Sequence, residues 1–366
     1  MELIDIIYKK KCTGCMACKN ACPKNAIIIE EDSNTGFLYP KINNELCFNC
    51  NICTKVCPVK NKLSENQNKI EVYACKNKND EIRMKSSSGG IFTLIANYIL
   101  KQNGIVFGAG FNEKFEVVHT WTDNEEGLEK FRGSKYLQSQ IRDSFKEAKS
   151  FLNEGRKVLF TGTPCQIEGL LSYLRKDYKN LYTQDIICHG VPSPKVWRKF
   201  LEYKKKIYNE MPLKINFRKK EIAGWNSYHT SFKYSHYEEN THHADDSYMK
   251  FFLRNFDLRD TCYDCKFKKL KRKSDITVAD FWGINNVRPE MNDEKGTSVV
   301  LINSLKGKEI FEIIKNDIIW TKENIEDIIK NNPCFVKSTY YNEKRENFFE
   351  DLERDNFESL IEKYLK

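Results

Sequence analysis

The sequence predicts a protein of mixed α+β and α/β class, with a small cysteine-rich domain, a larger α/β domain built on a mixed sheet, and a helical tail. Three observations lead to this prediction. Two similar cysteine runs lie within residues 1–62. From about Arg156 onward, strand-like, loop-like and helix-like segments alternate in the order typical of α/β proteins. From about Glu343 the chain has the amphipathic, charged pattern of a surface helix.

The first domain is expected to span residues 1–62. Its cysteine runs are KCTGCMACKNACP and LCFNCNICTKVCP, and each cysteine of the second run lies 35 residues after its counterpart in the first. The segments AIIIE and FLYPKI between the runs are predicted as short strands. The polar stretch VKNKLSENQNK that follows predicts a linker.

The α/β domain is expected to begin with residues 63–155. EVYACKN, IVFGAGF and VVHTWT are predicted as strands. A helix is predicted directly after SSSGG and before Gly104, because apolar residues recur there at helical spacing. These residues are Ile91, Leu94, Ile95, Tyr98 and Ile99.

The domain is expected to continue through residues 156–335. The strand KVLFTG, the loop TPCQ, the helix IEGLLSYLRK and the strand DIIC follow one another, and a further helix through VWRKFLEYKKKIY begins after PSP. Further strands are predicted at KINFRK, YHTSFKYS, SDITVADF and TSVVLIN. Residues 336–366 form the predicted helical tail.

Composition narrows the class of protein. The 366 residues are 40% hydrophobic and carry a formal net charge of +9. IFTLIANYIL is shorter than the roughly 20 residues needed to span a bilayer, and MELIDIIYKKK lacks the features of a signal peptide, so no transmembrane segment and a cytoplasmic location are expected. Basic clusters at Lys204–Lys206 and Lys266–Lys273 are either solvated helix faces or docking sites for an acidic electron carrier. Nucleic-acid binding is not expected, since no recognition motif accompanies the charge.

Both cysteine runs have the spacing C-x2-C-x2-C-x3-C-P, which is typical of bacterial two-cluster ferredoxins. In that arrangement the fourth cysteine of each run ligates the other cluster. Zinc is the alternative, but zinc sites usually employ two separated cysteine pairs. The spacing therefore predicts two [4Fe-4S] clusters, the first held by Cys12, Cys15, Cys18 and Cys57, and the second by Cys47, Cys50, Cys53 and Cys22.

Six of the fourteen cysteines lie outside these runs. Cys165 lies between a predicted strand and helix, Cys188 ends a predicted strand, and Cys262 and Cys265 form a C-x-x-C pair. Taken alone, Cys165 is open to three interpretations: a nucleophile activated by a helix N-terminus, a buried inert thiol, or a cluster ligand. Cys75 is expected in the core and Cys334 has no partner motif.

Several motifs occur in the order found in a known family. They are SSSGGIFTLI, GSKYLQSQ, FTGTPCQIEGLLSYL, DIICHGVPSPKVW, CYDCKF and SDITVADFWG. The stretch from about residue 70 to 330 thereby resembles the family of coenzyme F-420 hydrogenase/dehydrogenase beta subunits, whose members are iron–sulfur flavoproteins. The resemblance implies FAD and a third [4Fe-4S] cluster, with Cys165, Cys188, Cys262 and Cys265 at the positions of its ligands. It also implies a redox protein such as a ferredoxin as partner, and an organic molecule or the deazaflavin coenzyme as hydride partner.

Two segments are candidates for the flavin site. Ser87, Ser88, Gly89 and Gly90 precede a helix whose N-terminus would favour a pyrophosphate. In the GSKY motif, Gly133 permits close approach of the backbone to the flavin cofactor, and Lys135 supplies a cation near it. Ser134 and Tyr136 lie beside them in the motif. Asp280, Trp282 and Gly283 are candidates for lining the cleft, although Trp282 could equally belong to the core.

His189 follows Cys188 and is a weak candidate for a proton donor, since such a histidine is more often structural. These observations together predict an FAD- and iron–sulfur-dependent oxidoreductase that passes electrons between a one-electron partner and a hydride donor or acceptor. The alternative is an electron-transfer component of a larger complex, without a substrate site of its own. A third class, a structural protein with metal-stabilised folds, would contain no flavin.

Overall fold

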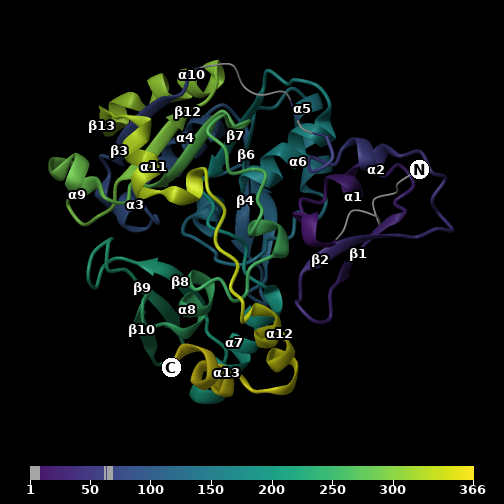
Figure 1. Cartoon of the computed structure of the whole chain (residues 1–366). Helices are drawn as coiled ribbons and strands as arrows, with labels where there is room; N and C mark the ends of the chain where they lie inside the picture. The colour runs from purple at the N-terminus through teal and green to yellow at the C-terminus, as the bar shows by residue number, and fades with distance from the viewer. Residues whose placement is uncertain (1–8, 62, 64–68) are drawn as a thin grey trace.

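The structure, a computed structural model, describes residues 9–61, 63 and 69–366. Most of the predicted linker and most of the N-terminal segment MELIDIIYKKK lie outside the described residues. Figure 1 shows three parts: the cysteine-rich domain at one side, a large sheet with its helices, and a second lobe below the sheet.

The cysteine-rich domain contains a two-stranded antiparallel sheet and short helices. Its elements are η2 (Lys9–Lys11), α1 (Ala17–Ala21), β1 (Ile27–Glu31), β2 (Leu38–Ile42) and α2 (Ile52–Lys55). The two cysteine runs repeat the same backbone conformation. Gly14 and Met16 have positive φ angles of 72° and 60°, and their counterparts Asn49 and Asn51 have 58° and 59°. The repeat in the sequence is thus also a repeat in local structure.

The large sheet has eight strands in the order β13-β3-β12-β11-β7-β6-β4-β5. Its strands are β3 (Glu71–Asn77), β4 (Ile105–Phe111), β5 (Val117–Thr122), β6 (Val158–Thr161), β7 (Leu181–Ile186), β11 (Ile276–Asp280), β12 (Ser298–Ile302) and β13 (Ile318–Lys322). The central strands β4, β6, β7 and β11 are parallel, and all other pairings are antiparallel. This is the mixed sheet predicted from the sequence, confirmed together with the α/β class.

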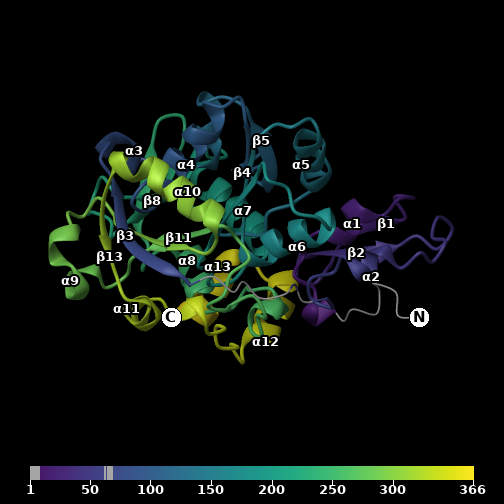
Figure 2. The same ribbon diagram turned by 90° about the horizontal axis from the view of Figure 1, so that it is seen from above.

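Helices cover both faces of this sheet because successive strand residues point to opposite faces and both sets are apolar. On one face, α4 (Ile91–Leu100) and α10 (Leu305–Ile314) form a cluster with side chains of β4, β6 and β12. On the other, α5 (Ser144–Asn153) and α6 (Pro164–Leu174) form a second cluster with side chains of β4, β6 and β7. Cys15, Met16 and Val56 belong to this second cluster, so the cysteine-rich domain packs onto the α/β domain through apolar contacts. Figure 2 shows α6 next to α1.

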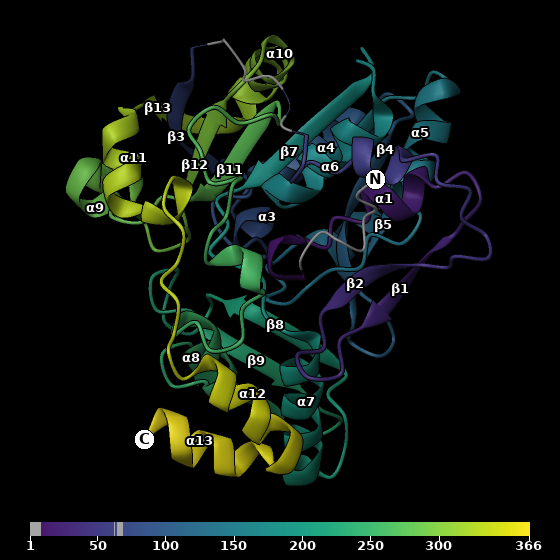
Figure 3. The same cartoon turned by 45° about the vertical axis from the view of Figure 1, so that its right-hand side comes forward.

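The second lobe is an antiparallel sheet of β8 (Lys214–Lys219), β9 (His229–Lys233) and β10 (Glu238–His242), covered by helices. These helices are α7 (Pro194–Tyr208), α8 (Ser247–Leu253), α12 (Arg345–Arg354) and α13 (Phe357–Leu365). Figure 3 shows α12 and α13 together beside this lobe. Its core is mainly aromatic and also takes in Phe37 and Tyr39 of the cysteine-rich domain.

The remaining short elements connect these parts. They are α3 (Asp80–Met84), η3 (Glu126–Phe131), η4 (Asp260–Cys262), α9 (Ile284–Val287), η5 (Pro289–Met291), η6 (Lys315–Asp317), α11 (Ile325–Asn331) and η7 (Pro333–Phe335). Within the described ranges, no helix is long and apolar enough to cross a membrane.

Three local predictions need correction. The segment TPCQ, predicted as a loop, supplies the N-cap and first residues of α6, which begins at Pro164. The strand expected to end at Cys188 ends at Ile186, so Cys188 lies in the loop beyond it. The single tail helix is two helices, α12 and α13, because Asp355 adopts an extended conformation between them. Strands β10 and β13 were not expected, since β10 is polar throughout and β13 exposes apolar as well as polar residues, so neither shows the alternation that marks a half-buried strand.

Candidate metal centres and flavin site

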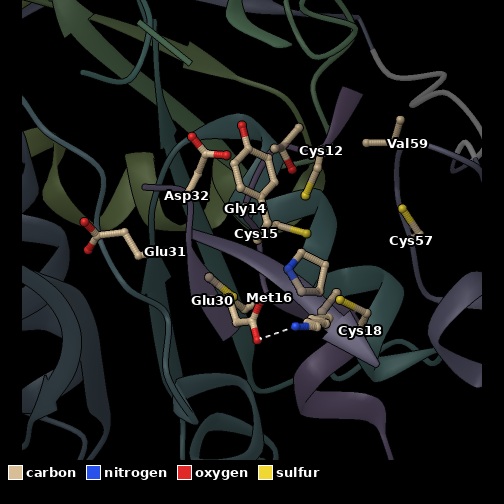
Figure 4. Close-up of a pocket in the computed structure, with 15 residues that line it drawn as sticks. Cys12, Gly14, Cys15, Met16, Cys18, Glu30, Glu31, Asp32, Cys57 and Val59 are labelled. Carbon is tan, nitrogen blue, oxygen red and sulfur yellow. Dashed lines mark hydrogen bonds and ion pairs between the residues drawn. The ribbon is translucent and has the colours of Figure 1, made fainter. Parts of the chain in front are cut away.

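Four cysteines from both runs surround one cavity in the cysteine-rich domain. The cavity has a volume of about 250 Å³, and Cys12, Cys15, Cys18 and Cys57 line it. Figure 4 shows their sulfur atoms facing this common space. Cys57 comes from the second run and the other three from the first, which is the crossed set expected for the first cluster.

The surroundings of these thiols suit ligands of an anionic cluster. Burial raises the pKa of Cys15 to about 12, and the neighbouring thiols of Cys57 and Cys12 act in the same direction. The backbone amides of Ala17 and Lys19 favour the thiolates of Cys15 and Cys18. Free thiols packed this closely stay protonated, and bound iron would supply the positive charge that stabilises them as thiolates.

The other four cysteines of the two runs surround a second, smaller cavity. Its volume is about 20 Å³, and Cys22, Cys47, Cys50 and Cys53 line it. The amide of Ala26 donates to Cys22 Sγ at 3.2 Å. This is again a crossed set, because Cys22 belongs to the first run. Within the described part of the chain, no three metal-binding side chains converge on one point as ligands of a single ion would. The spacing C-x2-C-x2-C-x3-C-P in both runs is what favours a cluster over zinc.

The four candidate ligands outside the runs also come together. Cys165 is the second residue of α6, directly after β6, and Cys188 follows β7. Because β6 and β7 are parallel neighbours, their carboxyl ends meet at one edge of the sheet. Cys262 ends η4, and Cys265 is fixed by its amide, which donates to Ser338 Oγ at 2.9 Å.

Electrostatic interactions between these thiols show that they are neighbours. Burial raises the pKa of Cys165, and Cys265 and Cys188 raise it further. Burial also raises the pKa of Cys188 and of Cys262 to about 12, in each case with other members of the set adding to the effect. A nucleophilic cysteine needs a lowered pKa, so the environment of Cys165 favours a ligand or an inert thiol.

Helix α6 joins this third thiol set to the first cavity. Cys165 and Gly169 are one turn apart on the same face of α6. A Cβ atom on Gly169 would lie 2.9 Å from Cys15 Cβ and 3.0 Å from Cys15 Sγ. Cys15 also contributes to the raised pKa of Cys165. The first cavity and the third thiol set therefore adjoin each other.

The other two cysteines lie elsewhere. Cys75 is fully buried in β3, as expected for a core residue. Cys334 lies in η7, with Sγ 3.5 Å from Nδ1 of His189. His189 Nε2 lies 2.7 Å from Asn255 Oδ1, and burial lowers the histidine's pKa. These contacts hold His189 in place beside the third thiol set.

The segment Ser87–Gly90 bonds largely to the protein itself. Ser88 Oγ donates to the Thr297 carbonyl at 2.9 Å, and the Gly89 amide donates to Ser298 Oγ at 2.9 Å. Gly90 caps the N-terminus of α4 with a φ of 79°. Ser87 Oγ lies 2.9 Å from Ser134 Oγ, so the two segments predicted for the flavin site meet.

The GSKY motif places a partly buried cation next to this contact. Lys135 Nζ donates to the carbonyls of Lys130 and Arg132 at 2.7 and 2.9 Å, and burial lowers its pKa to about 7. A Cβ atom on Gly133 would meet nothing within 4 Å, so this glycine borders open space.

Arg218 was not anticipated from the sequence, although it connects the flavin motifs. Its guanidinium donates to the Ser87 carbonyl at 3.1 Å and to Tyr136 Oη at 3.3 Å, and it pairs with both oxygens of Asp280. It also stacks on Trp282, 5.3 Å from the ring centre. Among the described residues, Arg218 Nε is buried without a hydrogen-bond partner. An arginine in a strand such as KINFRK carries no motif that would reveal it.

These residues fit a dinucleotide through their donors: serine and tyrosine hydroxyls, a partly buried lysine and an arginine with an unused N–H group. The backbone amides of Ser88–Gly90 offer the dinucleotide fewer hydrogen-bond donors than expected, because the Gly89 amide already donates to a partner in the protein.

The basic segment Lys266–Lys273 is not a solvated helix face. Arg272 is buried and pairs with Asp185 at 3.3 Å, and Lys268 Nζ donates to the His189 carbonyl at 2.9 Å. Lys268 also lowers the pKa of Cys188 against the dominant effects of burial and the Cys262 thiol. Part of this positive charge thus faces the third thiol set.

Models of known protein families match most of the chain. Residues 72–146 match the N-terminal model and residues 155–327 the C-terminal model of the coenzyme F420 hydrogenase/dehydrogenase beta subunit, which together span more than half of the chain. Residues 11–61 match a 4Fe-4S dicluster domain. The chain belongs to the family of coenzyme F420 hydrogenase/dehydrogenase beta subunits, a family of oxidoreductases, and carries an N-terminal iron–sulfur domain.

Individual relatives are distant. The chain is 26% identical over 175 residues to a subunit of the F(420)H(2) dehydrogenase of Methanosarcina mazei, covering 45% of this chain and 49% of that protein. It is 28% identical over 200 residues to coenzyme F420-dependent sulfite reductase of Methanocaldococcus jannaschii, covering 52% and 30%. The chain thus spans half or less of the length of these relatives. The F420-reducing [NiFe] hydrogenase complex from Methanosarcina barkeri contains a chain with 16% identity and a TM-score of 0.48, covering 74% of this chain and 91% of that one.

Proposed function

We propose that this protein is an oxidoreductase that transfers electrons between a one-electron redox protein and a hydride-exchanging organic molecule or deazaflavin coenzyme. The contact of Gly169 with Cys15, one turn from Cys165, carries the proposal, because it joins the ferredoxin-type domain to a thiol set in the α/β domain. When bound, [4Fe-4S] clusters exchange single electrons and FAD exchanges hydride or single electrons.

The cysteines would hold three clusters. The two crossed sets of the cysteine-rich domain take the first and second, and Cys165, Cys188, Cys262 and Cys265 take the third. Thr163 Oγ1 lies 3.1 Å from Cys165 Sγ and can stabilise a thiolate there. Lys268 and Arg272 supply positive charge on the Cys188 side.

Ser87, Ser134, Tyr136 and Arg218 would hold FAD, with Ser88, Gly89, Gly90 and Gly133 shaping the backbone around it. Lys135 would stabilise negative charge on the bound group, since it is a partly buried cation bonded only to carbonyls among the described residues. His189 orients the loop after Cys188 through Asn255, and its lowered pKa keeps it neutral at pH 7.

The discriminating experiment is Cys165→Ser in anaerobically purified full-length protein. We expect about twelve iron atoms in the wild type and about eight in the variant, with one cluster signal lost from the electron paramagnetic resonance spectrum. Cys188→Ser, Cys262→Ser and Cys265→Ser should behave alike. Cys75→Ser and Cys334→Ser are the matched controls and should retain all iron. Full iron with no turnover in Cys165→Ser would instead identify a nucleophile.

The second candidate is an electron-transfer subunit without its own substrate site. The observation that favours this second candidate is that the chain spans half or less of the length of these two relatives. Reduction of the isolated protein by ferredoxin, followed by transfer to a deazaflavin, separates the two. Reduction without any organic acceptor being turned over would support the second candidate.

A further inference from the structure

Arg259 lies at the junction of the cysteine-rich domain and the α/β domain. Its side chain is fully buried. Nε donates to the Cys12 carbonyl at 2.6 Å, Nη2 to the Leu38 carbonyl at 3.0 Å, and Nη1 to Gln138 Oε1 at 3.1 Å. The guanidinium also stacks on Tyr39, 4.2 Å from the ring centre. The Arg259 side chain thus donates hydrogen bonds to residues of both domains.

All of these partners are neutral, which sets Arg259 apart from other buried arginines. Each of the others is paired with a carboxylate: Arg83 with Asp293, Arg272 with Asp185, Arg345 with Asp260 and Arg218 with Asp280. Arg259 has no ion pair with any carboxylate of the described residues. A buried charge without a counter-charge is strongly unfavourable, so an anion is expected next to this guanidinium.

The candidate cluster sites supply that anion on both sides. Arg259 contacts the backbone of Cys12, a proposed ligand of the first cluster. It lies three residues before Cys262, whose amide donates to the Arg259 carbonyl at 2.8 Å. Burial and the neighbouring thiols raise the pKa of Cys262, and the positive charge of Arg259 opposes them. Ligated thiolates are anionic, so both sites attract the same cation.

The backbone next to Cys12 is adapted to this side chain. A Cβ atom on Gly14 would lie 2.6 Å from Gln138 Nε2 and 3.0 Å from Arg259 Nη1. The equivalent residue in the second run is Asn49, which has a similar φ but carries a side chain. Gln138 and Arg259 together leave no room for a side chain at position 14, and Arg259 donates hydrogen bonds to the first run and to β2.

We propose that Arg259 is the shared counter-charge of the first and third clusters, and that it raises the reduction potentials of both. Reduction adds negative charge to a cluster, and a fixed cation nearby in a water-poor interior favours the reduced form. Arg259 thus positions the first run through its hydrogen bonds, and its charge acts on both cluster sites. This inference rests on the proposed function, because it requires the third cluster.

The test compares Arg259→Gln and Arg259→Lys in the iron-loaded full-length protein by redox titration followed with electron paramagnetic resonance. Cluster signals are assigned by their loss in Cys12→Ser, Cys47→Ser and Cys165→Ser. In Arg259→Gln, we expect the first and third clusters to become about tenfold harder to reduce, equal to about 59 mV for one electron. The second cluster is the internal reference and should not shift. Arg259→Lys keeps the charge and should shift the two potentials less.

Unchanged potentials in Arg259→Gln, or an equal shift of all three clusters, would overturn the proposal. If Arg259→Gln loads no iron, Arg259→Lys decides the matter. Full iron loading of Arg259→Lys would show that the clusters require the positive charge. Failure of both variants to load iron would assign Arg259 only a hydrogen-bonding role and would overturn the proposal. A wild type with only two cluster signals would instead refute the proposed third cluster.

Discussion

The contact between α6 and the cysteine-rich domain depends on the absence of a side chain at position 169. In Gly169→Ala, the new Cβ would lie 2.9 Å from Cys15 Cβ and 3.0 Å from Cys15 Sγ, and 3.6 Å from Phe145. Contacts under 3.0 Å force a shift, and Cys15 has little freedom because its side chain is buried and would be bound to iron. The helix and the first cluster must therefore move apart.

The expected change in the free energy of unfolding of Gly169→Ala follows from two opposing effects. Replacing glycine by alanine inside a helix stabilises it by about 1 kcal/mol. Overpacking a buried contact costs about 1–3 kcal/mol. We therefore expect a net destabilisation between zero and about 2 kcal/mol, concentrated where α6 meets Cys15, with faster release of iron from the first cluster.

The assay is the rate of iron transfer to a chelator under anaerobic conditions, together with the apparent melting temperature of the loaded protein. Ser172→Ala in the same helix is the matched control, because the Ser172 hydroxyl is buried and has no hydrogen-bond partner among the described residues. Its removal should be neutral or slightly stabilising. A Gly169→Ala protein that is about 1 kcal/mol more stable than wild type and releases iron at the same rate would refute the close contact.

Two further predictions concern other parts of the chain. Cys12→Ser and Cys57→Ser should lose the same cluster signal although they lie in different runs; loss of two different signals would contradict the crossed ligand sets. Asp257 is fully buried, its carboxylate finds no partner beyond its own amide among the described residues, and burial raises its pKa to about 7. Because the unfolded carboxyl ionises near pH 4, the free energy of unfolding should fall as pH rises from about 4 to about 7, by at most about 4 kcal/mol. Asp257→Asn should reduce this slope in urea unfolding between about pH 4 and 7, and an unchanged slope would exclude Asp257 as its source.

Features encoded in short stretches could be predicted from the sequence. The spacing of the two cysteine runs reflects how one loop wraps around a cluster, so local geometry alone indicates the chemistry. Strands such as Glu71–Asn77 and helices such as Ile91–Leu100 follow from apolar periodicity and their glycine boundaries. The family resemblance, confirmed by the family models, rests on motifs of the same kind.

Tertiary structure decided which distant residues meet. Cys165 and Cys188 become neighbours only because β6 and β7 pair in parallel, and Cys262 joins them from a loop far along the chain. Arg218 and Arg259 have no sequence signal, because an arginine's role depends on whether burial leaves it beside a carboxylate, a hydroxyl or a cluster. The sequence by itself thus determined the iron–sulfur chemistry and the α/β class, whereas long-range strand order determined how the candidate sites adjoin, since only folding brings those side chains within reach of one another.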